Sequence, residues 1–409
     1  MINLKKLKEN KDWFQRKIEE KGVSIDLEEL LDIDKKRSEL IVQVEELNRQ
    51  KKEIASQKLE SSKGKEIKEK QRKIEESLKL IEKEYSDILS KIPNPAFDDV
   101  PVGGENKSEV IETKLRPTKL SFTPKSHEEL GKSLDIIDLE AAAKVSGSRF
   151  YYLKGKGAEL ELALLNYAKD IILKNDFKLI VPPVLVNKNS MWGMGYLEHG
   201  GNEEIYFLEK DDLYLVGTAE QAIGPMFKDQ TIAEKLLPIR YVGYSPSFRR
   251  ESGSYGKDTK GIIRVHQFNK LEMFVFCTPE QSEQEHQNIL RLEKILVEGL
   301  ELPYQVVNIA SGDLGLPAAK KYDIEVWFPS QDRYRETHST SNTTDFQSRR
   351  LNIKYLNDSG QKEFVHTVNG TAFAFGRIIA AIMENFQTKD GKVVIPKILQ
   401  PYTGFGQIE

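Results

Sequence analysis

Mostly apolar residues recur at alternating spacings of three and four along the first 92 positions. One series is Ile33, Arg37, Leu40, Val44, Leu47, Lys51 and Ile54, and the other is Ile67, Gln71, Ile74, Leu78, Ile81, Tyr85, Ile88 and Ile92. This spacing is the a/d pattern of a coiled coil. Residues 61–65 (Ser-Ser-Lys-Gly-Lys) carry a turn signal between the two series. The pattern therefore predicts an antiparallel helical hairpin whose arms are roughly 40–50 Å long, at about 1.5 Å per residue.

The predicted hairpin ends where prolines first appear. No proline precedes Pro93, and Pro95 follows two residues later. Proline stops a helix and favours an extended conformation in the residue before it. Residues 97–106 contain one proline and two glycines and are interpreted as a linker. We therefore divide the chain into an N-terminal helical coiled-coil domain (1–100) and a second domain (101–409).

The second domain mixes helical and strand-like patterns. Residues 158–174 have apolar positions near a 3.6-residue period and predict a helix. A strand pattern follows at 177–186, where Pro182 and Pro183 indicate an edge strand or an interface. Further strands are expected at 241–251, at 262–276, at 322–328 and at 364–375, where Asn369-Gly370 breaks the pattern. With a helix opened by Arg377, these elements predict an α+β fold in which helices flank an antiparallel sheet.

Polar and charged residues alternate with apolar ones in the strand expected at 262–276. Its period-2 pattern puts Arg264, His266, Phe268, Lys270 and Glu272 on one face. Such a face cannot lie in a dry core without partners. By the same argument Arg249 and Glu251 share a face of the preceding strand, and a glycine-rich loop, 252–261, joins the two strands. We interpret this face as the floor of a polar site; a solvent-exposed face carrying ion pairs is the alternative.

Composition limits the class of protein. The chain has 409 residues, of which 39% are hydrophobic and 31% charged, and its net charge of −3 means that any nucleic-acid surface must be a local patch. Cys277 is the single cysteine, which excludes an intrachain disulfide and a Cys-rich zinc site and favours a reducing compartment. The sequence has no apolar run of 18 residues and no secretory signal pattern at its start. We therefore expect a cytoplasmic protein without a membrane span.

Basic residues gather in the distal half of the predicted hairpin. Ten of them, Arg49, Lys51, Lys52, Lys58, Lys63, Lys65, Lys68, Lys70, Arg72 and Lys73, stand against four acids, Glu53, Glu60, Glu66 and Glu69, which gives 10 − 4 = +6. Such an arm can contact a phosphate backbone. A solvated coiled-coil face explains the same charges equally well.

Several residues of the second domain suit a nucleoside triphosphate. Arg249 and Arg377 lie on separate elements and can clamp phosphates, and Phe268 offers a ring for stacking. The carboxylates of Glu272 and Glu336 can hold a cation or Mg²⁺. The P-loop motif is absent from the sequence, and its glycines do not have the dinucleotide-binding spacing. The residues alone therefore indicate an ATP-using enzyme built on an antiparallel sheet.

Longer motifs resemble class II aminoacyl-tRNA synthetases. Phe248-Arg249-Arg250-Glu251, the glycine loop and Arg264-Val265-His266-Gln267-Phe268 resemble motif 2, Pro183 with its preceding helix and strand resembles motif 1, and Asn369-Gly370-Thr371 through Gly376-Arg377 resembles motif 3. The coiled coil, Val216-Gly217-Thr218-Ala219-Glu220, Gly256-Lys257-Asp258-Thr259-Lys260-Gly261 and the segments 339–342 and 345–350 are similar to the seryl-tRNA synthetase family. The resemblance covers nearly all of the chain.

The resemblance implies activation of serine by ATP and transfer of serine to tRNA. The implied ATP-binding residues are Arg249, Arg250, Glu251, Val265, Phe268, Glu336, Thr337, His338, Ser339 and Arg377. The implied serine-binding residues are Thr218, Ala219, Glu220, Arg249, Glu272, Asn369 and Thr371. Arg249, Glu336 and Arg377 are expected to be catalytic, and Glu336 and Ser339 to hold Mg²⁺. By the family's pattern Arg249 contacts the α-phosphate and the serine carboxylate, Arg377 holds the γ-phosphate, Phe268 stacks on adenine, and Glu272 pairs with the ammonium group.

The resemblance also implies the partners. The hairpin is expected to bind the long variable arm of serine tRNA through Arg49, Lys51, Lys52, Lys58, Lys63, Lys65, Arg72 and Lys73. A homodimer is expected through motif 1, and zinc is not expected, because Cys277 is the single cysteine. Whether selenocysteine tRNA is a second acceptor stays open.

The sequence departs from the family's pattern in two places. His338 and Thr340 stand where family members often have Cys or Ser, and Phe373 and Phe375 replace glycine-rich spacing in motif 3.

Two other functions compete with this one. A catalytically idle paralogue that only binds RNA would lose the pocket, but Arg249, Glu272, Glu336 and Arg377 are all present. A ligase that charges a carrier protein would lack the long basic hairpin.

Overall fold

The computed structural model describes residues 1–56, 61–117, 119–198, 201–252 and 261–409. The chain divides into two compact units, 1–95 and 96–409, and each is described by itself. Of the expected tRNA-binding residues, Lys58 lies outside the described residues, and so does the side chain of Lys63.

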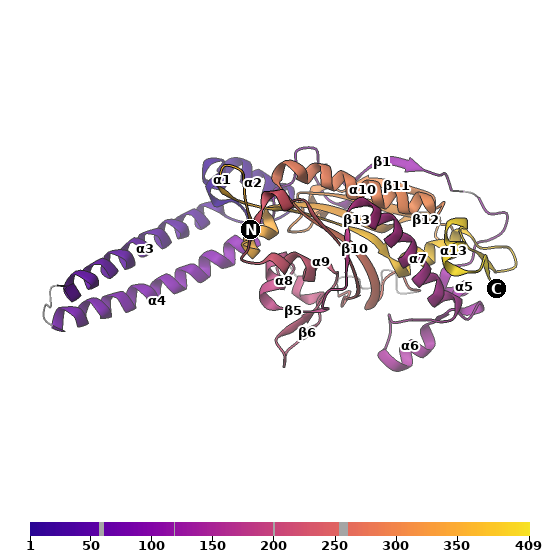
Figure 1. Ribbon diagram of the computed structural model, residues 1–409, viewed down its shortest axis with the longest axis horizontal. Coiled ribbons are helices and arrows are strands. Elements are labelled where there is room, and N and C mark those ends of the chain that lie inside the picture. The colour runs from indigo at the N-terminus through magenta and orange to yellow at the C-terminus, as the bar shows by residue number, and fades with distance from the viewer. Residues whose placement is uncertain (57–60, 118, 199–200, 253–260) are drawn as a thin grey trace. The chain divides into compact units, whose positions relative to one another are not determined.

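The first unit is entirely helical in its described residues (Figure 1). Its helices are α1 (Leu4–Glu9), α2 (Lys11–Glu20), α3 (Leu27–Ser56) and α4 (Ser61–Lys91). The long helices α3 and α4 lie side by side, which confirms the predicted hairpin. The short helices α1 and α2 pack against the base of the hairpin. The core that joins them consists of Ile2, Leu7, Phe14, Ile18, Leu27, Leu30, Leu89 and Ile92.

The turn of the hairpin is not where the sequence predicted it. Residues 61–65 form the start of α4, so the predicted turn signal lies inside a helix, and residues 57–60 lie outside the described residues. Glycine inside a helix costs about 1 kcal/mol relative to alanine. Gly64 has no heavy atom within 4 Å of the place where a β-carbon would stand. No neighbouring atom therefore requires a glycine at position 64. The 31-residue helix α4 tolerates the small cost of a glycine there.

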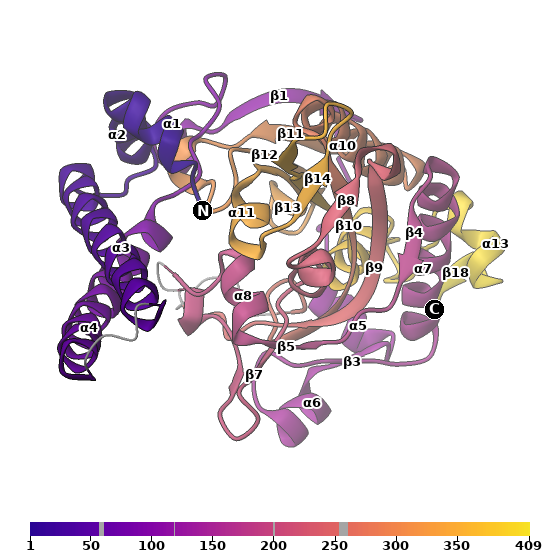
Figure 2. The same ribbon diagram turned by 60° about the vertical axis from the view of Figure 1, so that its left-hand side comes forward.

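The second unit is built on an eight-stranded sheet, and the expected α+β fold is confirmed. The strand order is β1 (Glu109–Lys114), β11 (Tyr304–Asn308), β12 (Lys320–Phe328), β13 (Arg333–Thr344), β16 (His366–Ala374), β10 (Gln267–Cys277), β9 (Ile239–Phe248) and β4 (Lys178–Ile180). All neighbours are antiparallel except β4 and β9. Figure 2 shows β10, β9 and β4 side by side, with helix α7 (Lys156–Ile172) next to β4.

Three amphipathic helices cover the apolar face of this sheet. They are α7, α10 (Ser282–Gly299) and α12 (Phe375–Asn385). Their buried residues, among them Leu164, Leu292 and Ile382, share one hydrophobic core with the sheet. Because the helices cover this face of the sheet, charged residues of the central strands such as Lys270 and Glu272 point to the opposite face.

Smaller elements complete the unit. They are α5 (His127–Ser133), β2 (Ile137–Asp138), α6 (Leu139–Ser146), β3 (Tyr152–Leu153), β5 (Leu185–Asn187), α8 (Lys188–Met194), β6 (Phe207–Leu208), β7 (Leu213–Leu215), α9 (Glu220–Ile223), β8 (Thr231–Ala233), α11 (Phe346–Leu351), β14 (Lys354–Leu356), β15 (Lys362–Phe364), β17 (Val393–Val394), α13 (Gln400–Thr403) and β18 (Gln407–Ile408). No helix in the described part of the chain is long and apolar enough to cross a membrane.

Two strand boundaries near the expected site differ from the sequence pattern. Strand β9 ends at Phe248, so Arg249 and Glu251 follow the strand, and β10 begins at Gln267, five residues later than expected. Residues 262–266 leave the sheet because their amides bond elsewhere: Ile262 N–H donates to His127 and His266 N–H to the Arg149 carbonyl. The expected break at Asn369-Gly370 is also absent, since β16 runs through both residues.

Two other expectations concern the ends of the sheet and the start of the unit. The prediction of an edge strand at 177–186 is confirmed, because β4 is the last strand of the sheet and the prolines lie between β4 and β5. Residues 97–106, interpreted as a linker, instead pack on the second unit. Phe97 N–H donates to the Ala319 carbonyl, and Val100 is buried against Val307 and Leu314.

Candidate active site

A pocket at the ends of β9, β10 and β16 brings together residues that the sequence places far apart. Its lining includes Arg249, Glu251, Val265, Phe268, Gly376 and Arg377. The Arg249 guanidinium carbon lies 5.3 Å from the centre of the Phe268 ring, a cation–π distance, and its Nε donates to the Gly217 carbonyl at 3.2 Å. Two of the three residues expected to be catalytic, Arg249 and Arg377, thus share one pocket with the expected adenine platform.

Arg377 is held at the other end of the pocket by three acceptors. Its Nη1 lies 3.1 Å from Glu336 Oε1 and donates to the Glu336 carbonyl, while its Nε donates to the Ile263 carbonyl at 3.4 Å. Burial would raise the pKa of Glu336, but the cations Arg377, Lys321 and Arg249 outweigh it and lower the pKa to about 2. Glu336 is therefore an anion at any physiological pH.

A bulge in β13 decides which residues face the pocket. Glu336 pairs with Glu325 and His338 pairs with Ile324, so Thr337 is an extra residue on β13. Residues three apart in a regular strand point to opposite faces, but the extra residue puts Glu336 and Ser339 on the same face. No local sequence pattern indicates this bulge.

The pair Glu336 and Ser339 suits Mg²⁺ by the chemistry of its donors. Both supply oxygen atoms, which Mg²⁺ prefers, and Mg²⁺ bound by one or two protein groups completes its shell with water and substrate phosphates. Ser339 lies opposite the buried Asp323 of the neighbouring strand β12. Among the described residues there is no group of three or more His, Cys, Asp or Glu side chains gathered for a metal ion.

Thr337 and His338, also expected at the ATP site, have buried side chains that do not face the pocket. The Thr337 hydroxyl donates to the Ile324 carbonyl, and the His338 ring lies 5.8 Å from the Phe373 ring. Burial lowers the pKa of His338 to about 3, so the ring is neutral. Any contact of these two residues with ATP would therefore involve their backbone.

A second group of polar residues, which we name the acidic pocket, gathers around Glu272 on β10 and β16. Glu272 accepts from Asn369 Nδ2 and from Thr371 Oγ1, both at 3.4 Å, and makes an ion pair with Lys270. Lys270 Nζ also donates to Thr218 Oγ1 at 3.3 Å. Thr218 and Glu272 thus contact the ammonium group of Lys270, and Asn369 and Thr371 join them through Glu272.

Glu220 adds a second buried carboxylate to this pocket. It accepts a hydrogen bond from the Tyr196 hydroxyl. Burial, together with the charge of Glu272, raises the pKa of Glu220 to about 7, and Lys270 and Arg249 oppose the shift. Burial also raises the pKa of Glu272. Ala219, the remaining expected residue here, is a buried core residue whose methyl group packs against Gly243.

Two residues of the acidic pocket were not among the expected site residues. Lys270 lay on the predicted polar face, where its alternation with Phe268 and Glu272 was a usable signal. Tyr196 lies on a separate segment that follows α8, and nothing in its sequence surroundings connects it to Glu220.

Arg250 and Glu251 leave the strand in different directions. Arg250 packs over the Tyr206 ring at 4.7 Å and donates to the Ile205 carbonyl, away from the residues that line the pocket. Glu251 lines the pocket and makes a 2.8 Å ion pair with Arg264. Of the two residues, Glu251 lines the pocket with Arg249 and Arg377, and Arg250 does not.

The described basic side chains in the distal half of the hairpin, 49–73, are exposed, apart from the half-buried Lys51, and several of them pair with acidic residues. Arg49 pairs with Glu46 and Glu53, Lys70 with Glu66, Arg72 with Glu76 and Lys73 with Glu69. These are pairs three or four residues apart on single helices, and such exposed pairs stabilise a helix by only about 0.3–0.5 kcal/mol. A polyanion can therefore displace the acidic partners at little cost.

The fold and the site are those of a class II aminoacyl-tRNA synthetase. A family model described as "tRNA synthetase class II core domain (G, H, P, S and T)" matches residues 206–386. A second, described as "Seryl-tRNA synthetase N-terminal domain", matches residues 1–96. The two matches include the helical hairpin, the pocket lined by Arg249 and Arg377, and Glu220, Lys270 and Glu272 of the acidic pocket.

Whole-chain comparisons give the particular family. A serine–tRNA ligase of Corynebacterium diphtheriae is 42% identical over 99% of this chain and 98% of its own length, and one of Thermobifida fusca is 51% identical over 78% of this chain and 76% of its own. The crystal structure of a seryl-tRNA synthetase from Pyrococcus horikoshii complexed with ATP matches with a TM-score of 0.91 and 37% identity, over 100% of this chain and 99% of that one. The chain belongs to the seryl-tRNA synthetase family.

Proposed function

We propose that the chain is a serine–tRNA ligase. It activates L-serine with ATP to seryl-adenylate and pyrophosphate and transfers serine to the 3′ end of serine tRNA. The observation that carries the proposal is the position of Arg249, which lines the ATP pocket with Arg377 and also lies near the acidic pocket, where it opposes the raised pKa of Glu220 and of Glu272. The guanidinium of Arg249 is therefore placed to contact both ATP and serine.

In the first step a serine carboxylate oxygen attacks the α-phosphorus of ATP, and the bond from that phosphorus to pyrophosphate breaks. Arg249 binds the α-phosphate and the serine carboxylate, which offsets their negative charges and brings the two reactants together. Arg377 binds the γ-phosphate, Phe268 stacks on adenine, and the backbone of Val265 contacts the base. Glu336 and Ser339 would hold Mg²⁺, which when bound neutralises phosphate charge.

The serine side chain and ammonium group occupy the acidic pocket. Thr218, Glu220, Glu272, Asn369 and Thr371 bind the amino acid, and its ammonium group replaces Lys270 as the partner of Glu272. In the second step a terminal hydroxyl of the tRNA attacks the carbonyl carbon of seryl-adenylate and AMP leaves. The variable arm of the tRNA binds the basic half of the hairpin.

The test is amino-acid-dependent exchange of pyrophosphate into ATP across serine, threonine, alanine and glycine, followed by charging of serine tRNA. Exchange that depends on serine and requires added Mg²⁺ is expected. Exchange with another amino acid alone, or none, would overturn the proposal. Selenocysteine tRNA is included in the charging assay as a second candidate acceptor.

We also infer a homodimer. Strand β4 is the last strand of its sheet, and Leu162 on α7 together with Leu179, Val181 and Leu185 exposes apolar surface beside it. An uncovered strand edge with apolar neighbours is suited to a second copy related by two-fold symmetry. Sedimentation at micromolar concentration should give twice the chain mass; a monomer would contradict the inference.

We also infer a cytoplasmic location, which suits the single buried cysteine, Cys277.

A further inference from the structure

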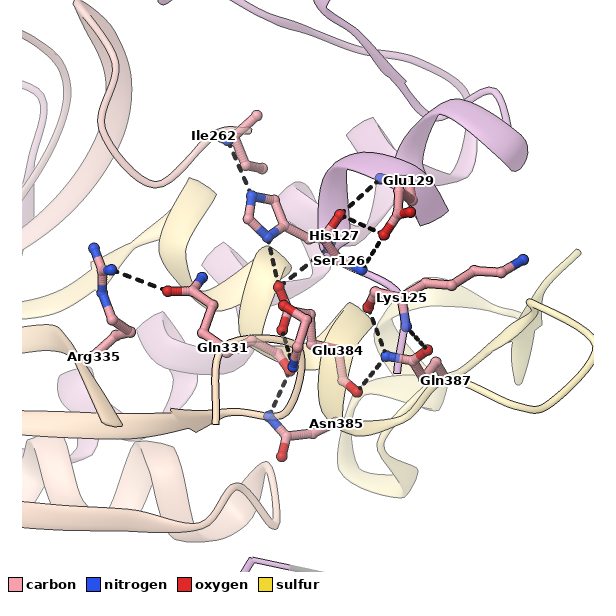
Figure 3. Close-up of polar contacts among 12 residues, drawn as sticks. Lys125, Ser126, His127, Glu129, Ile262, Gln331, Arg335, Glu384, Asn385 and Gln387 are labelled. Atoms are coloured by element: carbon pink, nitrogen blue, oxygen red, sulfur yellow. Dashed lines mark hydrogen bonds and ion pairs between the residues drawn. The ribbon is translucent and has the colours of Figure 1, made fainter. Parts of the chain in front are cut away.

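A buried carboxylate on α12 joins three segments that the chain keeps far apart (Figure 3). Glu384 is fully buried. Its Oε1 accepts from the backbone N–H of His127 at 3.2 Å and lies 2.7 Å from His127 Nδ1, while its Oε2 accepts from the backbone N–H of Ser330 at 3.1 Å. Glu384 thus connects α12 with the start of α5 and with the turn between β12 and β13.

The imidazole of His127 extends this connection to a fourth segment. Its Nε2 lies 3.2 Å from the backbone nitrogen of Ile262, which is a donor only. Nε2 must therefore be the acceptor, so the proton is on Nδ1 and is donated to Glu384. The backbone amide fixes the tautomer of the ring, and the ring bridges Glu384 to Ile262 (Figure 3).

Gly261 allows the chain to pass close over this ring. Its φ is +71°, and a β-carbon there would stand 2.0 Å from His127 Nε2. A side chain at this position would be strained by the backbone angle and would also collide with the imidazole. The bridge between His127 and Ile262 therefore depends on a glycine at the end of the motif 2 loop.

The segment that His127 holds is a wall of the ATP pocket. Ile262 and Ile263 both line the pocket, and the Ile263 carbonyl accepts from Arg377 Nε. Arg377 and Glu384 are seven residues apart on α12, so they lie on the same side of the helix, two turns from each other. Glu384 supports the pocket wall by binding His127, which accepts from the Ile262 N–H. Arg377 is held by the same wall, because it donates to the Ile263 carbonyl.

We propose that His127 and Glu384 are positioning residues that fix the Ile262–Ile263 wall and, through it, the guanidinium of Arg377 for binding ATP. The inference rests on the proposed function, since it assigns these two residues a part in ATP binding. Neither residue makes a described contact with the acidic pocket. The pair therefore affects the Michaelis constant for ATP and leaves that for serine unchanged.

Two substitutions of His127 separate its two hydrogen bonds. In His127→Asn the side-chain amide stands near the place of Nδ1, so it donates to Glu384 but cannot reach Ile262. In His127→Gln the amide stands near the place of Nε2, and its oxygen can accept from the Ile262 N–H. Ser126→Ala is the matched control, because it removes the cap of α5, where Ser126 bonds Glu129, without touching the bridge.

The experiment measures serine-dependent pyrophosphate exchange of the full chain with ATP and serine varied in turn. Loss of one buried hydrogen bond is expected to raise KM for ATP about three- to tenfold in His127→Asn, with KM for serine changed less than about twofold. His127→Gln should recover most of the loss, and Ser126→Ala should lower the melting temperature without changing either KM.

Two results would overturn the inference. One is a KM for ATP in His127→Asn equal to that of the wild type. The other is a parallel rise of both Michaelis constants that His127→Gln does not reverse. If His127→Asn fails to fold, hydrogen exchange of the wild-type protein decides: a peptide covering 261–268 should retain a slowly exchanging amide at Ile262, and fast exchange there would refute the bridge. Wild-type protein without serine-dependent exchange would instead refute the proposed function.

Discussion

The carboxyl group of Glu293 on α10 fills the space beside Gly370 that a β-carbon would need. A β-carbon at Gly370 would stand 2.6 Å from Glu293 Oε1, 2.4 Å from Ile289 Cγ2 and 2.9 Å from Thr340 Cβ. Gly370 lies on β16 between Asn369 and Thr371, which both hydrogen-bond Glu272. The absence of a side chain at one position thus lets a helix pack closely behind the acidic pocket.

Gly370→Ala is expected to lower both stability and activity. Overpacking a close contact costs typically about 1–3 kcal/mol, and the strand must shift to relieve it. That shift moves Asn369 and Thr371, so KM for serine should rise more than KM for ATP. Thermal melting and exchange kinetics measure the two effects. Gly64→Ala, on the open surface of α4, is the matched control and should slightly stabilise the hairpin. An unchanged melting temperature in Gly370→Ala would contradict the packing argument.

The ionisation of Glu293 should make stability depend on pH. Burial, together with the charges of Glu272 and Asp323, raises its pKa well above the ordinary value of 4.5, and neither carboxyl oxygen has a hydrogen-bond partner among the described residues. The folded protein therefore keeps a proton that the unfolded chain releases above pH 4.5. Stability consequently falls as the pH rises from 4.5 toward the folded-state pKa.

Glu293→Gln removes this titration and should stabilise the protein. The gain in free energy of unfolding relative to the wild type is expected to grow between pH 5 and pH 8, because only the wild type has the loss of stability that the raised pKa of Glu293 causes. Chemical denaturation at both pH values measures it. A gain that is equal at the two pH values would show that Glu293 is not protonated in the folded protein.

Much of the fold could be predicted from the sequence, because periodicity reports which face of an element is buried. The heptad spacing located α3 and α4, and the prolines at 182–183 located the edge of the sheet. The turn of the hairpin and the start of β10 could not be placed. Ser61 through Lys65 suit either a turn or an exposed helix, and the amides of Ile262 and His266 bond His127 and Arg149 instead of a neighbouring strand.

The candidate site divides in the same way. Arg249, Phe268 and Arg377 were identifiable as residue types that suit a nucleotide, and the family resemblance assigned their roles. The bulge at Thr337, the bond between Tyr196 and Glu220, and the bridge at His127 depend on contacts between segments far apart in the chain. No local pattern encodes such contacts, so only the structure reveals them.

Arg249→Ala should abolish serine-dependent exchange and leave the fold intact. Removing one group that stabilises transition-state charge typically costs about 3–4 kcal/mol, or a hundredfold or more in rate. Arg250→Ala is a suitable control, because Arg250 packs on Tyr206 away from the pocket. A loss of less than about tenfold in Arg249→Ala would mean that the motif 2 assignment is wrong.

Thr371→Ala should raise KM for serine and weaken the rejection of alanine. Thr371 donates to Glu272 at 3.4 Å, and a pocket that hydrogen-bonds the substrate hydroxyl discriminates strongly against a substrate that lacks it. Exchange rates with serine and alanine as separate substrates measure the change. Serine kinetics equal to those of the wild type would remove Thr371 from the site.

Removing residues 49–73 and rejoining the helices by a short turn should separate the two reaction steps. Serine-dependent exchange is expected to stay nearly unchanged, while charging of serine tRNA drops by orders of magnitude, mainly through KM for tRNA. In the intact protein the affinity for tRNA should fall as salt rises, because phosphate contacts release counterions. Equal loss of both activities would identify the hairpin as a folding element, and full retention of charging would exclude its role in tRNA binding.

The hydrophobic cores of the two units have no member in common among the described residues. One core extends from Ile2 to Ile92, and the others begin at Ala96. We therefore expect each unit to unfold in a transition of its own, so the melting temperature of the second unit is the one that Ser126→Ala and Gly370→Ala should lower. A cavity made at Leu30 lowers one transition and a cavity at Phe373 lowers the other. A mutation in the first unit can thus impair tRNA binding while amino-acid activation persists. The two activities can therefore change independently during evolution.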